Sequence, residues 1–254
     1  MYRFTARRWE TNTLDLVVYF TKTTFRPSLI PFLTSLAAVV VLPLELHLSG
    51  APFTIYASVG VGWMGLAILL ISDVLVTITA FQIRGAYGLY LKTLPFTPLQ
   101  LSITRFAAQT LISFPYVFAF LILNDAFFFS FRIHPITFIT TIVLLTISAF
   151  GMAGFTATLV LFVKSPASLS FLVSFLGTIV TYVSPVYYQL SSLPTLAQPF
   201  VLAIPTTPAI QLARGLIGLG AISPLEVAEW VAVEGFWAIL GILKLSSTLK
   251  PQPS

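Results

Sequence analysis

Long apolar runs, interrupted by short polar segments, dominate the pattern of the chain. Six runs are long enough to be helices that cross a bilayer, because the hydrocarbon core is about 30 Å thick and a helical crossing takes roughly 20 apolar residues. The runs cover residues 29–48, 53–81, 101–123, 135–163, 166–187 and 225–243. The pattern therefore predicts an all-α integral membrane protein with six transmembrane helices.

The first polar segment, residues 7–26, mixes charges with apolar side chains at helical spacing. Leu14, Val17, Val18 and Phe25 fall on one side of a helix built from this segment. A basic amphipathic helix of this kind is typical of the membrane interface. We therefore predict an N-terminal interfacial helix at 7–26, and a plain basic tail is the alternative.

The composition supports a membrane protein and argues against enzyme chemistry. Hydrophobic residues make up 57% of the 254 residues and charged residues only 8%, whereas a soluble domain carries about 25% charged residues. Residues 1–254 are therefore interpreted as a single transmembrane domain. The chain has no cysteine, and its only histidines, His47 and His134, fall in predicted loops without a nearby carboxylate pair. We predict no catalytic residue and no metal site.

The basic residues favour one orientation in the membrane. The net charge is +5, and an excess of lysine and arginine marks cytoplasmic loops more readily than a nucleic-acid site. With the N-terminus inside, only Arg132 and Arg214 lie outside. The cytoplasmic set is Arg3, Arg7, Arg8, Lys22, Arg26, Arg84, Lys92, Arg105, Lys164, Lys244 and Lys250. This distribution predicts a multi-pass plasma-membrane protein with both termini in the cytoplasm.

One uncharged stretch, residues 165–213, is long enough for two crossings. Two crossings would place Lys244 and Lys250 outside, whereas one crossing followed by a segment that enters and leaves on the same face keeps them inside. Prolines break the stretch into short helices, whose backbone at membrane depth has to be sheltered by protein. We therefore predict a re-entrant segment at 186–220 that caps the outer end of the bundle. The prolines that break the uncharged stretch include Pro185, Pro194, Pro199, Pro205 and Pro208.

The loop at residues 82–100 is the main polar interruption on the predicted cytoplasmic side. A short helix between two spans would project a docking surface into the cytoplasm, and an ordinary basic loop is the alternative. Leucines supply apolar contacts there, and prolines would start the next helix. The residues that define the loop are Arg84, Gly85, Leu91, Leu94, Pro95 and Pro98.

Two motifs resemble those of membrane subunits in the type 2 family of ATP-binding-cassette exporters. Between spans two and three, such subunits carry the pattern R-G-x-x-x-x-L-x-x-L-P-x-x-P-x-x-L. This chain has RGAYGLYLKTLPFTPLQL, with leucines one place away from some family positions. After span five, the family has a Ser-Pro, a Leu-Pro and a distant arginine. The matching residues here are Ser184, Pro185, Leu193, Pro194, Pro205 and Arg214.

The resemblance implies an ABC transporter permease with six helices, a coupling helix at about 84–96 and re-entrant helices after span five. It also implies two partners: a cytoplasmic ATPase subunit that binds ATP and Mg²⁺, and a second permease subunit in a homodimer or a heterodimer. No lysine of the chain follows a glycine, so a P-loop is absent and no cofactor is expected in this chain. Family members often have acidic residues before the Arg-Gly, whereas this chain has Gln82 and Ile83, which argues against ionic docking there.

Two acidic residues, Asp73 and Glu234, lie within apolar runs. A charge at membrane depth is costly and commonly faces a cavity or a partner. The first hypothesis is an exporter subunit that moves a substrate outward with ATP hydrolysed elsewhere. The second is an ion-coupled secondary transporter or channel that uses these two carboxyl groups. A membrane-embedded enzyme is the third, but no catalytic constellation supports it.

Small residues recur at four-residue spacing in the fourth apolar run. Ala149, Ala153 and Ala157, with Gly154 beside them, allow another helix to approach closely. We expect tight packing within the subunit here, in preference to a dimer seam.

Overall fold

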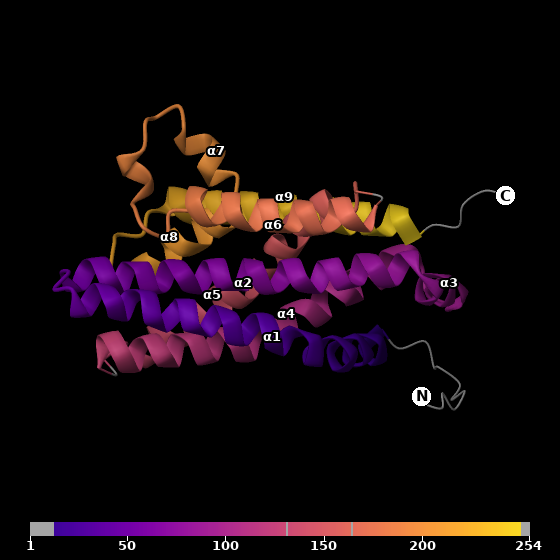
Figure 1. Cartoon of the computed structure of the whole chain (residues 1–254), viewed down its shortest axis with the longest axis horizontal. Helices are drawn as coiled ribbons and strands as arrows, with labels where there is room; N and C mark the ends of the chain where they lie inside the picture. Colours follow the sequence, from indigo (N-terminus) through magenta and orange to yellow (C-terminus); the bar gives the residue numbers. More distant parts are fainter. Residues whose placement is uncertain (1–12, 131, 164, 250–254) are drawn as a thin grey trace.

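The computed structural model describes residues 13–130, 132–163 and 165–249, and these residues form helices joined by turns. The long helices lie side by side in a bundle (Figure 1). Short helices lie at the two ends of the bundle. The elements are α1 (Thr13–Leu48), α2 (Phe53–Arg84), α3 (Ala86–Thr93), α4 (Pro98–Asn124), the π-helical turn η1 (Asp125–Phe129), α5 (Pro135–Val160), α6 (Pro166–Val183), the 3₁₀ turn η2 (Leu190–Ser192), α7 (Gln198–Leu202), α8 (Thr206–Leu216) and α9 (Pro224–Leu249).

Each of the six apolar runs predicted from the sequence coincides with one long helix: α1, α2, α4, α5, α6 or α9. Within the described part of the chain, four segments are long and apolar enough to cross a membrane, namely Ser28–Leu48, Phe53–Ile83, Pro98–Phe129 and Pro135–Val160. Helix α6 has 18 residues and is therefore about 27 Å long. Helix α9 contains three glutamates and one lysine. Length and composition alone thus support four spans.

One helix, α1, contains the described residues of both the predicted interfacial helix at 7–26 and the predicted first span at 29–48. Helix α1 runs without interruption from Thr13 to Leu48, although Pro27 lies within it. The part of the predicted interfacial helix before Thr13 lies outside the described residues. Neighbouring helices can hold a proline-containing helix together in a membrane bundle. Here the hydroxyl of Ser28 is hydrogen-bonded to the hydroxyl of Tyr116 on α4, which anchors α1 directly after the proline.

The two ends of the bundle gather different elements. Helix α1 begins, α9 ends and α3 lies at one end, which we call the α3 end (Figure 1). The turns α1–α2 and α4–α5, together with η2, α7 and α8, lie at the opposite end, which we call the α8 end. A buried cluster joins the helices of the α3 end, and it includes Leu16, Phe20, Ile83, Leu91, Leu101, Leu245 and Leu249.

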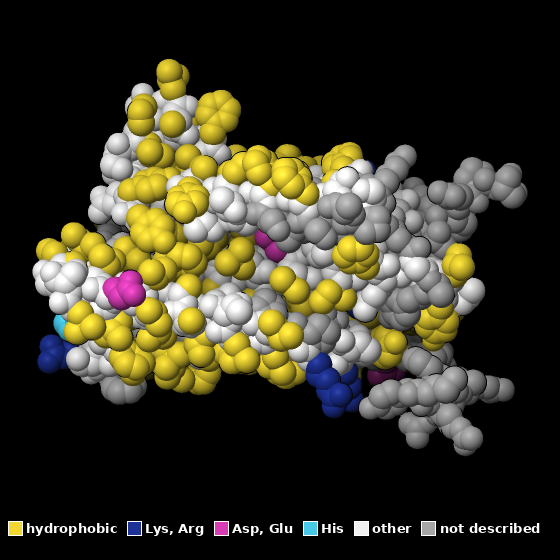
Figure 2. Space-filling view, viewed as in Figure 1, with side chains coloured by type: hydrophobic (Ala, Val, Ile, Leu, Met, Phe, Trp, Pro, Cys, Tyr) yellow, Lys and Arg dark blue, Asp and Glu magenta, His cyan; other side chains and the backbone are white. Residues whose placement is uncertain are grey.

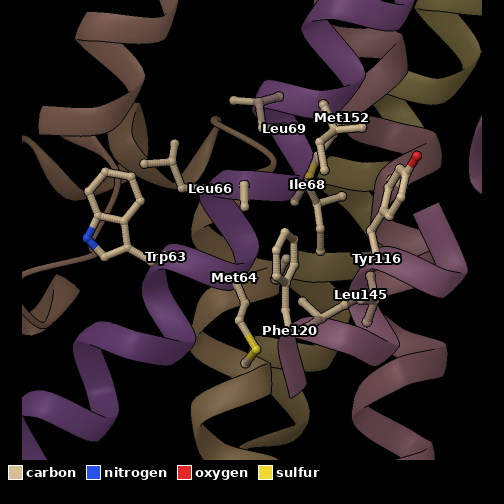
Figure 3. Packing of buried hydrophobic residues seen from close by; sticks show 14 of the residues in the cluster. Trp63, Met64, Leu66, Ile68, Leu69, Tyr116, Phe120, Leu145 and Met152 are labelled. Carbon is tan, nitrogen blue, oxygen red and sulfur yellow. The ribbon is translucent and has the colours of Figure 1, made fainter. Parts of the chain in front are cut away.

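Helix α5 lies at the centre of the bundle and packs against α2, α4, α8 and α9. Figure 3 shows the apolar core between α2, α4 and α5, where Phe120 and Leu145 lie close to Met64. The closest approach is between α5 and α9, because a Cβ atom on Gly154 or Gly241 would overlap the backbone of the facing helix. The predicted row Ala149, Ala153 and Ala157 is buried within the chain, so close packing inside the subunit is confirmed.

The outside of the bundle is compatible with a lipid environment. Apolar side chains are exposed along α1, α5 and α9, and hydrophobic side chains are spread over much of the face seen in Figure 2. A soluble monomer rarely exposes so continuous an apolar surface. The exposed set includes Ile30, Leu33, Ile136, Ile139, Phe236 and Ile239.

Candidate functional site

Arg214 on α8 forms hydrogen bonds that connect the segments of the α8 end. Its side chain is 7% exposed, and its guanidinium donates only to backbone carbonyls in the contacts described. Nε and Nη2 lie 3.1 and 2.9 Å from the carbonyl oxygen of Ser58 on α2. After α6, Nη1 lies 2.6 Å from the Pro185 oxygen and 3.3 Å from that of Tyr188, while Nη2 lies 2.7 Å from the Val186 oxygen. One side chain therefore ties α8 to α2 and to the segment that follows α6.

Gly62 makes room for this guanidinium on α2. A Cβ atom on Gly62 would lie 2.8 Å from the Val186 Cα and 2.9 Å from the Arg214 Nη2. Burial lowers the pKa of Arg214 to about 10, so the side chain remains a cation at neutral pH. Because its N–H groups point at carbonyls, Arg214 acts as a clamp and is poorly placed to bind an anion.

The sequence motif of the predicted re-entrant segment is only partly brought together. Ser184 and Thr206 share a buried hydrogen bond of 2.6 Å between their hydroxyl groups. Pro205 directly precedes α8, so Ser184, Pro185, Pro205 and Arg214 all lie around the clamp. Leu193 and Pro194 belong instead to residues 189–203, which we call the α7 arm.

The two parts of the predicted re-entrant segment pack differently. Helix α8 packs against α2, α5 and α9, whereas the α7 arm projects away from the bundle (Figure 1). Leu196 and Phe200 on the arm are exposed. The difference follows from side-chain contacts, since α8 is held by the Arg214 clamp and the hydroxyl pair while the tip of the arm has no comparable anchor among the described contacts.

A polar hollow of about 300 Å³ lies beside the clamp. Polar groups from α2, the α7 arm, α8 and the first turn of α9 line it. The Glu226 carboxylate in its wall accepts hydrogen bonds from the backbone and hydroxyl of Ser223, which fixes the start of α9. Its polar lining consists of Ser58, Gln189, Ser191, Gln211, Arg214 and Glu226.

A short helix is present at the predicted place in the α3 end. Gly85 separates α2 from α3, and its backbone N–H closes the last turn of α2 on the carbonyls of Phe81 and Gln82. After α3, the side chains of Thr97 and Gln100 form a capping box that starts α4 with Pro98 in its first turn. Turn chemistry in the sequence thus sets both ends of the loop 82–100.

The leucines of the predicted coupling loop differ in their exposure. Leu91 is only 5% exposed and belongs to the buried cluster with Leu16 and Phe20 of α1, so its side chain packs within the chain. Leu94 is partly buried against the same cluster. Leu89, the first leucine of the same loop, is 68% exposed. Helix α3 has eight residues and carries leucines on more than one face. Its packing on α1 decides which of these leucines points outward.

Arg105 on α4 contacts both α2 and α1 near the α3 end. It is 8% exposed, and its Nε donates to the Thr79 hydroxyl at 3.0 Å while its Nη2 donates to the Gln82 side-chain oxygen at 2.7 Å. The guanidinium also lies 4.8 Å from the centre of the Phe20 ring. Gln82, at the position where the family often has an acidic residue, is therefore engaged inside the chain.

Both predicted intramembrane carboxyl groups are buried against α5. Asp73 on α2 accepts a hydrogen bond from the hydroxyl of Thr156. Glu234 on α9 lies against Gly151, and neither of its carboxyl oxygens has a hydrogen-bond partner in the described part of the chain. The two groups contact α5 from different helices.

The two histidines serve local packing at the α8 end. The His134 ring nitrogen accepts from the Ile136 backbone at the start of α5, and the His47 ring packs on Tyr56. No cluster of three metal-binding side chains is found in the residues that the structure describes. Neither protein-family models nor curated proteins match this chain, so the family resemblance rests on the sequence motifs alone.

Proposed function

We propose that the chain is the permease subunit of an ATP-binding-cassette exporter, which moves a substrate outward with ATP hydrolysed by a separate cytoplasmic subunit. The observation that carries the proposal is α3, a short helix held between two candidate spans at one end of the bundle. The quoted motifs support it, because they occur in the family's order. In this proposal α6 and α9 are the fifth and sixth spans, and α7 and α8 form the re-entrant segment.

The two ends of the bundle then lie on opposite sides of the plasma membrane. The α3 end, where α1 begins and α9 ends, faces the cytoplasm, and the α8 end faces outward. Two permease subunits pair with two ATPase subunits. ATP binding draws the ATPase subunits together, and α3 transmits their displacement to the bundle as a rigid-body shift.

The contacts of α3 suggest that one of its faces attaches it to the bundle and another docks to the ATPase. Leu91 fastens the helix to α1 within the buried cluster, so a push on α3 moves the bundle. Leu89 and Tyr90 on the exposed side provide the apolar anchors that usually dominate a docking interface. The bound nucleotide and Mg²⁺ remain with the ATPase partner.

The test is Leu89→Asp, measured by co-purification with the ATPase and by substrate-stimulated ATP hydrolysis. We expect both to be lost while the subunit stays inserted and folded, because a carboxylate would lie in an apolar interface. The matched control is Leu196→Asp, which changes an exposed leucine at the opposite end. Retention of both activities in Leu89→Asp would rule out α3 as the docking element.

Leu91 and Leu94 are less suitable for this test than their motif positions suggest. An aspartate at Leu91 would be buried against the chain's own α1, so it would disturb the fold and the docking surface together. Comparing Leu89→Asp with Leu91→Asp separates a docking defect from a packing defect.

An ion-coupled carrier or channel is the second candidate, favoured by the burial of Asp73 and Glu234 in the helix bundle. Uptake or efflux driven by an ion gradient in vesicles that lack any ATPase distinguishes it from the exporter. Such transport should disappear in Asp73→Asn or Glu234→Gln if the carboxyl groups carry the ion.

A further inference from the structure

Glu234 is a buried carboxyl group that lies beside the Ser148 hydroxyl of α5. It lies near the middle of α9, is 5% exposed, and neither carboxyl oxygen accepts or donates a hydrogen bond within the described residues. Gly151 on α5 makes the space for it, because a Cβ atom there would overlap both the carboxyl group and the backbone of Glu234. Asp73 differs, since Thr156 donates to it.

The polar groups closest to Glu234 are engaged elsewhere. On the facing side of α5, the Ser148 hydroxyl accepts from the indole of Trp230 at 2.8 Å and donates to the Leu144 carbonyl at 3.0 Å. The indole of Trp237, one turn further along α9, donates to the Ala203 carbonyl at 2.7 Å. Ser148 is thus a polar neighbour of the carboxyl group, but its hydroxyl proton is directed at the Leu144 carbonyl.

The two buried guanidinium groups that pack near α9 lie towards its ends. Arg214 shares a hollow with Glu226, which precedes Glu234 by eight residues or about 12 Å of helix. Arg105 shares a gap with Leu245, which follows Glu234 by eleven residues or about 16 Å. Arg214 donates to carbonyls, and Arg105 donates to Thr79 and Gln82. Neither provides a counter-charge at the middle of α9.

A carboxylate in these surroundings would be a buried charge without compensation, which proteins avoid by binding a proton. We propose that Glu234 is a proton-binding site that is loaded while α5 and α9 are packed together at Gly151. Separation of the two helices admits water, and the carboxylic acid then ionises and releases its proton to that water. Repacking of the helices takes one proton up again. The proposal is independent of the ATPase, because the site lies wholly within this chain.

Infrared spectroscopy of the full chain in lipid vesicles tests the site directly. At neutral pH we expect a carbonyl band of a protonated carboxylic acid that is lost in Glu234→Gln. The band of the wild-type protein should also respond slowly to D₂O, because the group is shielded from water. Asp73→Asn is the matched control and should keep the band assigned to Glu234. Spectra in which Glu234→Gln removes a carboxylate band would overturn the proposal.

The role of helix packing is tested by Gly151→Ala. Its new methyl group would force α9 away from α5, so the band of the protonated acid should decrease and a carboxylate band should appear at the same pH. Gly235→Ala is the control, since a Cβ atom there meets no other atom within 4 Å. An unchanged acid band in a folded Gly151→Ala protein would show that packing does not hold the proton.

Stability provides a second measurement should Gly151→Ala fail to fold. Above the pH at which an exposed glutamate ionises, about 4.3, the packed protein binds one proton more than the unfolded chain. Its unfolding temperature should therefore fall as the pH rises. The Glu234→Gln protein lacks this proton and should lose that part of the pH dependence. Parallel pH profiles for the two proteins would contradict the proposal.

Discussion

Arg105 and Arg214 are buried to nearly the same extent at opposite ends of the bundle, yet they hold different kinds of partner. Arg214 donates to four backbone carbonyls from α2 and from the segment after α6. Arg105 donates to two side chains of α2, Thr79 and Gln82, and lies over the Phe20 ring of α1. Side chains can change rotamer while the backbone stays in place, whereas a carbonyl moves only with its chain segment.

This difference suggests how the two ends respond to a displacement. At the α8 end, any movement of α2 relative to α8 has to break the Arg214 clamp or carry the segment after α6 along with it. At the α3 end, Arg105 can follow a shift of α2 by small rotations of itself and of Gln82. An adjustable end beside α3 and a fixed end around α8 suit a bundle that is moved from the α3 end.

Removing the clamp should have the largest effect of the three substitutions that probe this comparison. Arg214→Met leaves the carbonyls of Pro185, Val186 and Tyr188 without their donor, and each buried unsatisfied group costs about 1–3 kcal/mol. We expect a total loss of about 3–5 kcal/mol, measured as the free energy of unfolding in detergent micelles. Arg214→Lys is the control and should recover part of the loss. A change below about 0.5 kcal/mol would mean that the clamp does not hold the α8 end.

Removing Arg105 should cost less. After Arg105→Met, the Thr79 hydroxyl still donates to the Leu75 carbonyl, and Gln82 can turn towards water. Polar contacts within membrane bundles average about 0.6 kcal/mol each, and a cation over an aromatic ring adds about 0.5–1 kcal/mol. The expected loss in the same unfolding experiment is therefore about 1–2 kcal/mol. A loss as large as that of Arg214→Met would remove the distinction between the two ends.

The smallest expected effect is that of Ser184→Ala, which removes one hydroxyl of the pair with Thr206. The remaining hydroxyl is buried, so we expect a loss of about 1 kcal/mol in unfolding free energy. Ser191→Ala, at an exposed position of the α7 arm, should stay within about 0.5 kcal/mol of the wild-type protein. Equal values for both variants would show that this hydroxyl pair does not fasten α8.

Helix α1 shows how contacts between distant residues support a helix that contains proline. The sequence predicts an interfacial helix at 7–26 and a first span at 29–48, and α1 contains the described residues of both segments as one helix. The hydroxyl of Ser28 and the Phe25 ring both contact Tyr116 of α4. Proline weakens a helix locally by removing one hydrogen bond, and contacts with a residue far along the chain offset that loss. Residues 7–12 lie outside the described part of the chain.

The sequence by itself determined the long helices, because their apolar runs and flanking turn residues are local properties of the chain. It also indicated the short helix after Gly85 and the importance of Ser184, Pro185 and Arg214. The sequence could not decide the partners of these residues. Arg214 binds backbone carbonyls, and every residue has such a carbonyl, so the residue types do not identify its partners. Leu91 faces inward only because α1 covers it. Contacts between distant segments depend on how whole helices pack, so the clamp, the exposed face of α3 and the surroundings of Glu234 emerged only in the tertiary structure.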